Sequence, residues 1–320
     1  MKNNSKKNLS LLLLTMQINL SACSGLSSNH MATPELSNAP VPPVSGQSSQ
    51  NVDTERTESG ENKPPANTPA VAGDDEKENR YLYSFVRSNP NDPAGMINFG
   101  INQTTQINQS ISSAGSVPFQ IETELDAMAM STETFQQKFA ELREKLKPQD
   151  TFVLYTHSHG LIPGLGLNWN ASNRFDIPFS WRLFAQEILS LPAKNVIVFT
   201  MSCHSGYLTE ALNSLSSEWK NKRKSAGRNL IVLTAVSKEQ LAKATDQGTT
   251  SDSLGNPFTY AVKTAIKGAA DGFGGQTKDG KTQLSELVGY VLSVAKSKSL
   301  DAYADPQIAG EYNEDEVFLQ

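Results

Sequence analysis

Two segments of this chain decide its fold: residues 151–160, TFVLYTHSHG, and residues 195–206, NVIVFTMSCHSG. Each is an apolar run with the length of a buried strand, and each ends in small and polar residues. In an open α/β sheet, the carboxyl ends of the strands are where reactive groups gather. The first segment carries His159 and the second carries Cys203. A thiol and an imidazole at the same sheet edge form the two parts of a cysteine nucleophile.

Strand-like and helix-like segments alternate around these two. Residues 87–115 lack a clear period and are predicted to be irregular, with a helix near residues 96–108. The alternation predicts one α/β domain over residues 81–320, with a mostly parallel sheet covered by helices on both faces. Besides the two quoted segments, strands are expected at residues 81–86, 117–121 and 230–235, and helices at residues 131–146, 179–191, 207–219, 256–266 and 282–295.

The amino terminus has the pattern of an export signal. A short positive stretch is followed by an apolar run at residues 9–20, which is too short to span a bilayer stably. The run ends in LSAC at residues 20–23, which resembles the bacterial lipobox. This resemblance implies a signal peptide over residues 1–22 and lipid chains on Cys23, and more than one chain anchors a protein stably. The alternative is an ordinary cleaved signal with an incidental cysteine.

The expected location depends on this anchor. Ser24 rather than Asp follows Cys23, which by analogy with enteric bacteria favours the outer membrane. Residues 23–80 are then a lipidated N-terminus and a tether, because they are rich in proline and polar residues and cannot bury enough surface to offset their ordering entropy. We therefore expect a lipid-anchored protein of the bacterial cell envelope whose domain stands off the membrane.

The charge and the cysteine content of the chain limit the classes of function that it can have. The net charge of −5 gives no basic footprint for nucleic acid, and the basic cluster at residues 220–224 is predicted to be a solvated helix end and loop. The chain contains two cysteines. If Cys23 is lipidated, Cys203 has no disulfide partner and is a candidate reactive thiol. The alternative is a buried cysteine that acts as a small hydrophobic residue.

The order of these motifs resembles the caspase-fold cysteine peptidases, and the legumain branch in particular. The resemblance covers roughly residues 81–300 and rests on four patterns: a KPQD turn at residues 147–150, HG at residues 159–160, SCHSG at residues 202–206 and NPFT at residues 256–259. Ser202 stands where the family usually has alanine, and the first third of the domain matches poorly. The resemblance implies a caspase-like three-layer sandwich that cleaves peptide bonds, or transfers the acyl group to another amine, through a thioester.

The same resemblance assigns roles within the site. It implies that Cys203 is the nucleophile, that His159 is its base, and that the backbone N–H groups of Gly160 and Cys203 line an oxyanion hole. We expect Gly160 and Gly206 to let the substrate backbone approach closely, and the helix that begins near Gly206 to favour a thiolate through its dipole.

Two other histidines flank the pair. His157 lies two residues before His159 and is expected to be a hydrogen-bonded neighbour of the site. His204 is adjacent to Cys203, so its side chain should point away, to solvent or to a pocket wall. His157-x-His159 lacks further ligands in a recognisable metal spacing, and the acidic stretch at residues 271–279 lacks an EF-hand pattern, so no metal or cofactor is expected.

Substrate preference is left open by the sequence. Arg87 follows the first strand and would favour an acidic or asparagine side chain, whereas Ser237, Asp246 and Asp252 follow a later strand and an acidic residue there would favour arginine or lysine. Each of these could equally be a solvated loop residue. The expected partners are a protein or peptide substrate and the membrane. The alternative is a non-catalytic surface lipoprotein that binds a protein or a glycan on the same scaffold.

Overall fold

The structure is a computed structural model, and it describes residues 77–88, 92, 94–125, 130–167, 178–215, 221, 223–244, 254–299 and 304–320. The expected signal peptide, Cys23 and nearly all of the tether lie outside these residues. The described part of the chain holds no helix with the length and apolarity needed to cross a membrane. Almost all of the described residues belong to the predicted α/β domain.

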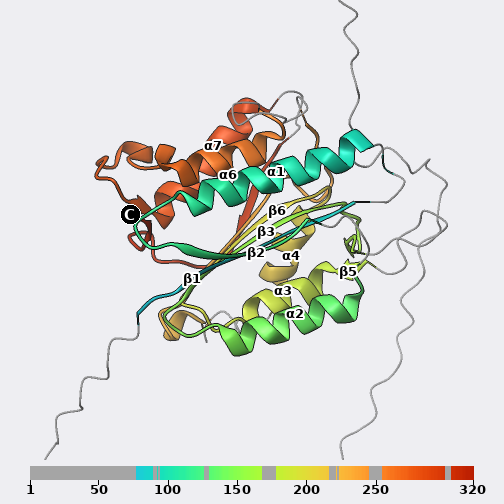
Figure 1. Ribbon diagram of the computed structural model, residues 1–320, viewed down its shortest axis with the longest axis horizontal. Helices are drawn as coiled ribbons and strands as arrows, with labels where there is room; N and C mark the ends of the chain where they lie inside the picture. The colour runs from blue at the N-terminus through green and yellow to red at the C-terminus, as the bar shows by residue number, and fades with distance from the viewer. Residues whose placement is uncertain are drawn as a thin grey trace, which may run out of the picture. The chain divides into compact units, whose positions relative to one another are not determined.

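A sheet forms the centre of the domain, between layers of helices (Figure 1). It has six strands in the order β2-β1-β3-β6-β7-β9. Its first five strands are parallel, and β9 joins the edge antiparallel to β7. The strands are β1 (Arg80–Arg87), β2 (Phe119–Glu124), β3 (Thr151–Ser158), β6 (Asn195–Met201), β7 (Asn229–Thr234) and β9 (Gln307–Ala309). The predicted mostly parallel sheet is confirmed, whereas β9 was not predicted because three residues carry too little pattern.

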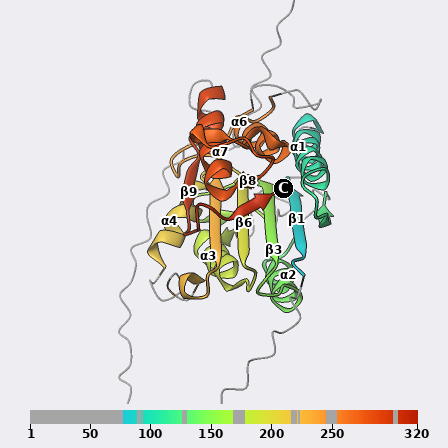
Figure 2. The same ribbon diagram turned by 90° about the vertical axis from the view of Figure 1, so that its left-hand side faces the viewer.

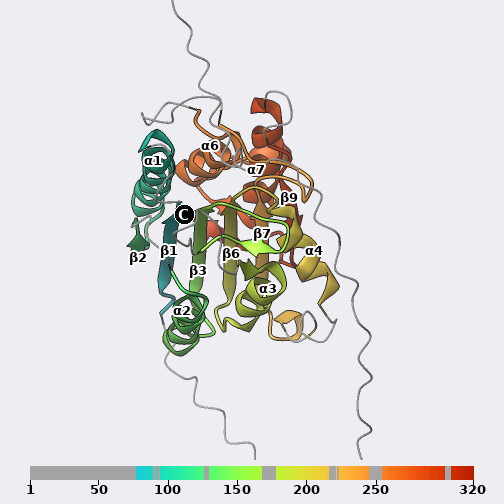
Figure 3. The same cartoon turned by 90° about the vertical axis from the view of Figure 1, so that its right-hand side faces the viewer.

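Helices cover both faces of this sheet, as predicted (Figure 2). One face carries α1 (Ala94–Ser112), α6 (Pro257–Thr264) and α7 (Leu284–Lys298), and the other carries α2 (Thr132–Lys145), α3 (Trp181–Ser190) and α4 (Gly206–Ser214) (Figure 3). Two apolar cores result, one on each side of the sheet. The short elements are β4 (Gly164–Leu165), β5 (Phe179–Ser180), β8 (Thr282–Gln283), β10 (Val317–Leu319), η1 (Ala265–Ala269) and η2 (Phe273–Gly275).

Helix α1 is longer than the sequence predicts. Residues 87–115 were expected to be irregular with a helix near residues 96–108; the helix is confirmed, and it runs continuously from Ala94 to Ser112. Its buried face carries Gln103, Thr104 and Ser110 beside Phe99 and Ile107. Because polar side chains occupy positions that face the core, the apolar period of the helix does not appear in the sequence.

Two predicted helix caps are present. The Ser131 hydroxyl at the start of α2 accepts a hydrogen bond from the Thr134 N–H at 3.1 Å. At the start of α6, Asn256 Oδ1 accepts from the N–H groups of Phe258 at 2.8 Å and Thr259 at 3.3 Å. Asn256 is fully buried, and its Nδ2 also donates to the Lys243 carbonyl at 2.6 Å. Asn256 therefore ties α6 to the loop that follows β7.

We predict that Asn256→Ala lowers the free energy of unfolding by about 2 kcal/mol, because the substitution removes a buried cap and also the hydrogen bond from Asn256 to the Lys243 carbonyl. Urea unfolding followed by circular dichroism measures the loss. Ser131→Ala is the matched control, since this cap is exposed, and it should cost about 1 kcal/mol or less. Equal losses in the two variants would contradict the buried role of Asn256.

Candidate active site

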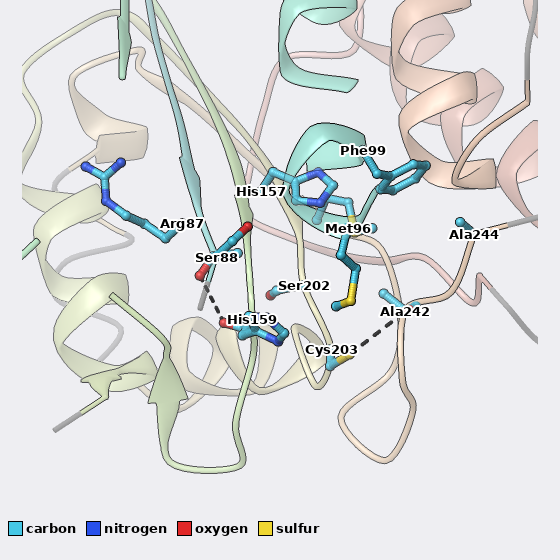
Figure 4. Close-up of a pocket in the computed structure, with 12 residues that line it drawn as sticks. Arg87, Ser88, Met96, Phe99, His157, His159, Ser202, Cys203, Ala242 and Ala244 are labelled. Atoms are coloured by element: carbon cyan, nitrogen blue, oxygen red, sulfur yellow. Dashed lines mark hydrogen bonds between the residues drawn. The ribbon is translucent and has the colours of Figure 1, made fainter. Parts of the chain in front are cut away.

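The register of β3 and β6 brings His159 and Cys203 together. His157 pairs with Met201 as the last partners of the two parallel strands, so His159 and Cys203 each lie two residues beyond that pair. The backbones remain close past the strands: a Cβ added to Gly160 would lie 1.7 Å from the Cys203 carbonyl oxygen. Figure 4 shows the two side chains next to each other at this edge. The predicted meeting of thiol and imidazole positions is thus present.

Both residues line a small cavity, which we call the site cavity. Its volume of about 30 Å³ leaves room for no more than a few water molecules. Its walls come from the end of β1, the start of α1, the ends of β3 and β6, and the loop after β7 (Figure 4). Met96, Phe99, Met201, Ala242 and Ala244 give it a largely apolar lining. A substrate side chain does not fit without movement of one of these walls.

Asp92 is a site residue that the sequence analysis missed. His159 Nε2 lies 2.8 Å from Asp92 Oδ2, and the two side chains are only 11% and 14% exposed. When Asp92 is ionised its carboxylate only accepts, so the hydrogen bond requires the proton on Nε2 and leaves Nδ1 as the nitrogen that can take a proton from a thiol. Asp92 follows β1, the direct neighbour of β3 in the sheet. Asp92 could have been found only from the strand order, because a carboxylate in the loop after an adjacent parallel strand reaches the same edge of the sheet.

The state of the sulfur differs from the expected free thiol. The structure holds Cys203 in a disulfide whose partner lies outside the described residues. The side chain is 1% exposed, and Sγ lies 3.8 Å from the Ala242 carbonyl oxygen. In this conformation Cys203 cannot act as a nucleophile, because its sulfur is bonded and covered. Lipid on Cys23 would occupy the sulfur of the only other cysteine in the sequence, so lipidation and a disulfide between the two cysteines exclude each other.

His157 faces helix α1. Its ring lies edge-on to Phe99 with the centroids 5.7 Å apart, and Gly100 gives it space, since a Cβ there would lie 3.3 Å from Nε2. Burial lowers the pKa of His157 to about 3, with repulsion from His159 as the second cause. Among the described residues, Nδ1 has no hydrogen-bond partner. The expected hydrogen-bonded histidine is therefore a neutral imidazole packed among apolar groups.

His204 holds the loop that follows β7. Its Nδ1 donates to the Lys238 carbonyl at 2.8 Å, and its backbone N–H donates to the Gln240 carbonyl at 2.9 Å. Its φ of 56° is uncommon for a residue other than glycine, although histidine is among the more tolerant residues. His204 is half-buried, so it keeps part of the expected solvent exposure, and its side chain also anchors the loop that places Ala242 against Cys203.

Both glycines are required by close contacts within the chain. A Cβ on Gly160 would overlap the Cys203 backbone, and a Cβ on Gly206 would lie 2.5 Å from the Lys238 backbone nitrogen. The expected close approach of a substrate backbone stays a prediction for both. Hydrogen bonds from Gly166 N to His159 O and from Leu161 N to Gly164 O flank Gly160. In such an antiparallel pair the N–H of the residue between the two bonds points away from the partner segment, so residues 164–166 leave the Gly160 N–H without a bond from their side.

Of the four proposed specificity residues, the structure brings one to the site. Arg87 lines the site cavity but is buried, and its guanidinium bonds Glu124 and the Val86 carbonyl. Arg87 is thus not the solvated residue of the alternative interpretation, and its charge is already paired. The Ser237 N–H donates to Gln240 Oε1 at 3.2 Å, and Ser237 is not among the residues that line the cavity. Asp246 and Asp252 lie outside the described residues.

We predict that Gly160→Ala destabilises the fold by about 1–3 kcal/mol, because the new methyl group overlaps the Cys203 backbone and overpacking of a rigid contact has this cost. Thermal unfolding followed by calorimetry measures the effect. The control is Gly95→Ala in α1, where a Cβ meets nothing within 4 Å and a helical alanine should stabilise by up to about 1 kcal/mol. A neutral Gly160→Ala variant would contradict the close contact at this edge.

We predict that His157 makes the fold less stable in acid. Its pKa is about 3 in the folded protein and about 6.5 in an unfolded chain, so between these values the unfolded state binds the extra proton. The contribution of His157 is therefore complete above about pH 6.5 and declines as the pH falls toward 3. Urea unfolding at pH 7, 5.5 and 4 measures the slope. His157→Gln should flatten it and His204→Asn should leave it unchanged, and identical slopes in all three proteins would contradict this assignment.

Comparisons with known proteins do not identify this chain. The sequence matches no protein-family model, and it matches no curated protein. The function of the site must therefore be inferred from its own residues, of which the Asp92–His159 pair and the adjacent Cys203 are the chemically distinctive group.

Proposed function

We propose that this chain is a cysteine endopeptidase with a caspase-like fold, held at a bacterial membrane by lipid on Cys23. One observation carries the proposal: His159 and Cys203 occupy equivalent positions beyond two neighbouring parallel strands, and Asp92 bonds the nitrogen of His159 that a thiol would not use. A carboxylate, an imidazole and a sulfur in this order are the parts of an activated thiol nucleophile.

The reaction would proceed in two steps. His159 Nδ1 takes the proton from the Cys203 thiol, and the thiolate attacks the carbonyl carbon of the peptide bond. The resulting tetrahedral oxyanion collapses to a thioester, while the imidazolium returns the proton to the departing amine. Water or another amine then attacks the thioester, which frees the acyl group and restores the thiol. Hydrolysis and transfer to a second peptide share this thioester and differ only in what attacks it.

The surrounding groups support this chemistry. The Asp92 carboxylate favours the imidazolium that forms in each step, through a hydrogen bond between two largely buried side chains. Helix α4 begins at Gly206, so the positive end of its dipole is three residues from Cys203. The outward N–H of Gly160 lies beside the same backbone and could donate to the oxyanion. The sheet order and its two helical layers agree with the caspase-like sandwich that the motifs imply.

Activity requires a change in the sulfur. Cys203 must be a thiol, and Ala242 must move away from it. Lipidation of Cys23 would meet the first condition, because the mature chain would then have no second sulfur for an internal disulfide. The second condition concerns the loop that His204 holds at the Lys238 and Gln240 carbonyls.

One observation favours the second candidate function, a non-catalytic lipoprotein that binds a protein or a glycan. Cys203 is 1% exposed, and a buried sulfur in a disulfide is what a structural cysteine provides. The Asp92–His159 pair weighs against this alternative, because a structural disulfide does not need an oriented imidazole beside it.

The test is hydrolysis of a peptide library by the full chain under reducing conditions, with labelling by a peptide acyloxymethyl ketone. We expect labelling at Cys203 that is lost in Cys203→Ala. We expect His159→Ala to lower turnover at least about 100-fold, the usual range for loss of a general base. His204→Ala is the contrasting variant: its ring takes no part in proton transfer and only holds the covering loop at Lys238, so turnover should be kept or raised. Labelling that is absent from the reduced protein, or that is independent of His159, would reject the peptidase in favour of the binding protein.

A further inference from the structure

A second cavity lies at the opposite edge of the sheet, where the parallel strands begin. It is formed between the end of α3, the end of α4 and the start of β7, and its volume is about 130 Å³. Its polar lining includes Arg223, Lys224, Arg228 and Glu311. We call it the basic cavity. No part of the proposed peptidase site uses it.

The charges of the basic cavity do not balance. Three cationic side chains line it together with one carboxylate, which leaves an excess of two positive charges. The one ion pair among them joins Lys224 Nζ and Glu311 Oε2 at 3.9 Å, with side chains that are 76% and 51% exposed. Such an exposed and long contact contributes little and does not hold either side chain in place. The carboxylate therefore neutralises neither Arg223 nor Arg228.

Arg223 is the unusual member of this group. Residues 220–224 were expected to be solvated, but Arg223 is only 6% exposed. Its guanidinium donates to the carbonyls of Leu191, Ala193 and Asn229, at 2.7, 3.3 and 2.9 Å. Among the described residues no carboxylate pairs with it, and its buried Nε has no hydrogen-bond partner. A buried charge without a counter-ion is costly, so the charge of Arg223 lowers the stability of the fold.

Arg228 adds to that penalty. Burial lowers the pKa of Arg223 to about 10, and the nearby charge of Arg228 is the second cause. A hydrogen bond from the Arg228 N–H to the Arg223 carbonyl, at 3.0 Å, holds the two residues close together. Repulsion between two cations in one cavity falls when an anion lies between them. The same groups that destabilise the empty cavity would therefore stabilise it when an anion is bound.

We propose that the basic cavity binds a phosphate-type anion. A phosphate monoester carries a charge of about −1.5 to −2 near pH 7, which matches the excess of two positive charges. Arginine is suited to it because the planar guanidinium donates two parallel hydrogen bonds to phosphate oxygens. A cavity needs about 10–15 Å³ of this kind of volume to hold one water molecule, so about 130 Å³ has room for several waters or for one tetrahedral anion. The phosphate can be a free ion or part of a lipid headgroup, and the two sources share this chemistry.

The test uses the full chain with inorganic phosphate as the probe. Calorimetric titration measures its affinity, and thermal unfolding in phosphate is compared with unfolding in sodium chloride of equal ionic strength. Arg223 is retained because three carbonyls depend on it, and the variant combines Lys224→Gln with Arg228→Gln. We expect phosphate to raise the unfolding midpoint of the parent, and the affinity to fall at least about tenfold in the double variant. The control is Lys267→Gln, an exposed residue of η1 after α6, in the opposite layer, which should behave like the parent.

A second experiment distinguishes a free phosphate ion from the phosphate of a lipid headgroup. Flotation with phosphatidylcholine vesicles, with and without phosphatidic acid, compares the parent with the double variant, and the lipid anchor contributes equally to both. Stronger binding of the parent to the acidic vesicles supports a headgroup phosphate, and titration of inorganic phosphate alone supports a free ion. An affinity that is unchanged in the double variant, or no effect of phosphate together with no preference for acidic vesicles, would overturn the proposal. Because this site is independent of Cys203, its failure would not affect the proposed peptidase.

Discussion

The contact between Gly160 and the backbone of Cys203 is the constraint on which the candidate site depends. Strands β3 and β6 run parallel and in register as far as His157 and Met201, and the contact keeps the two chains together beyond that point. No side chain fits at residue 160, so the backbones next to His159 and Cys203 are in direct contact. The distance between the imidazole and the sulfur therefore depends mainly on this backbone contact, and less on the rotamers of the two side chains. The Asp92 carboxylate fixes the imidazole from a third strand end. Geometry of this kind is preorganised, which is what a nucleophile and its base require.

In the proposed peptidase, both the disulfide and the loop that covers the sulfur limit reactivity. Ala242 belongs to a loop that is held from the α4 side, by the two hydrogen bonds of His204, by the packing of Gly206 and by the ion pair of Lys238 with Glu210. None of these contacts involves the β3–β6 pairing. A shift of the loop could thus expose the sulfur without a change in the register that aligns it with His159. The burial of the sulfur and its alignment with His159 therefore depend on different contacts.

The sequence predicted the parts of the fold whose pattern is local. Buried strands and amphipathic helices were found because each repeats its own period, and the caps at Ser131 and Asn256 depend on residues within one turn. The full length of helix α1 was not predicted because Gln103 and Thr104 occupy its buried face. Asp92 was missed because only the parallel pairing of β1 with β3 brings it to His159, 67 residues later. The backbone contacts at Gly160 and Gly206 were not foreseen for a related reason, since a sequence shows where a side chain is missing but not what fills the space.

The arginines buried at the edges of the sheet differ in their partners. Arg87 at the carboxyl edge pairs with Glu124, and Arg80 at the opposite edge pairs with Glu78. Arg223, also at the opposite edge, has carbonyl partners only. A neutral donor such as glutamine could bond carbonyls without the cost of burying a charge, so carbonyl bonding alone does not account for an arginine there. The neighbouring Arg228 increases the cost of that charge. An anion in the basic cavity would supply to Arg223 the compensation that Glu78 and Glu124 supply to the other two arginines.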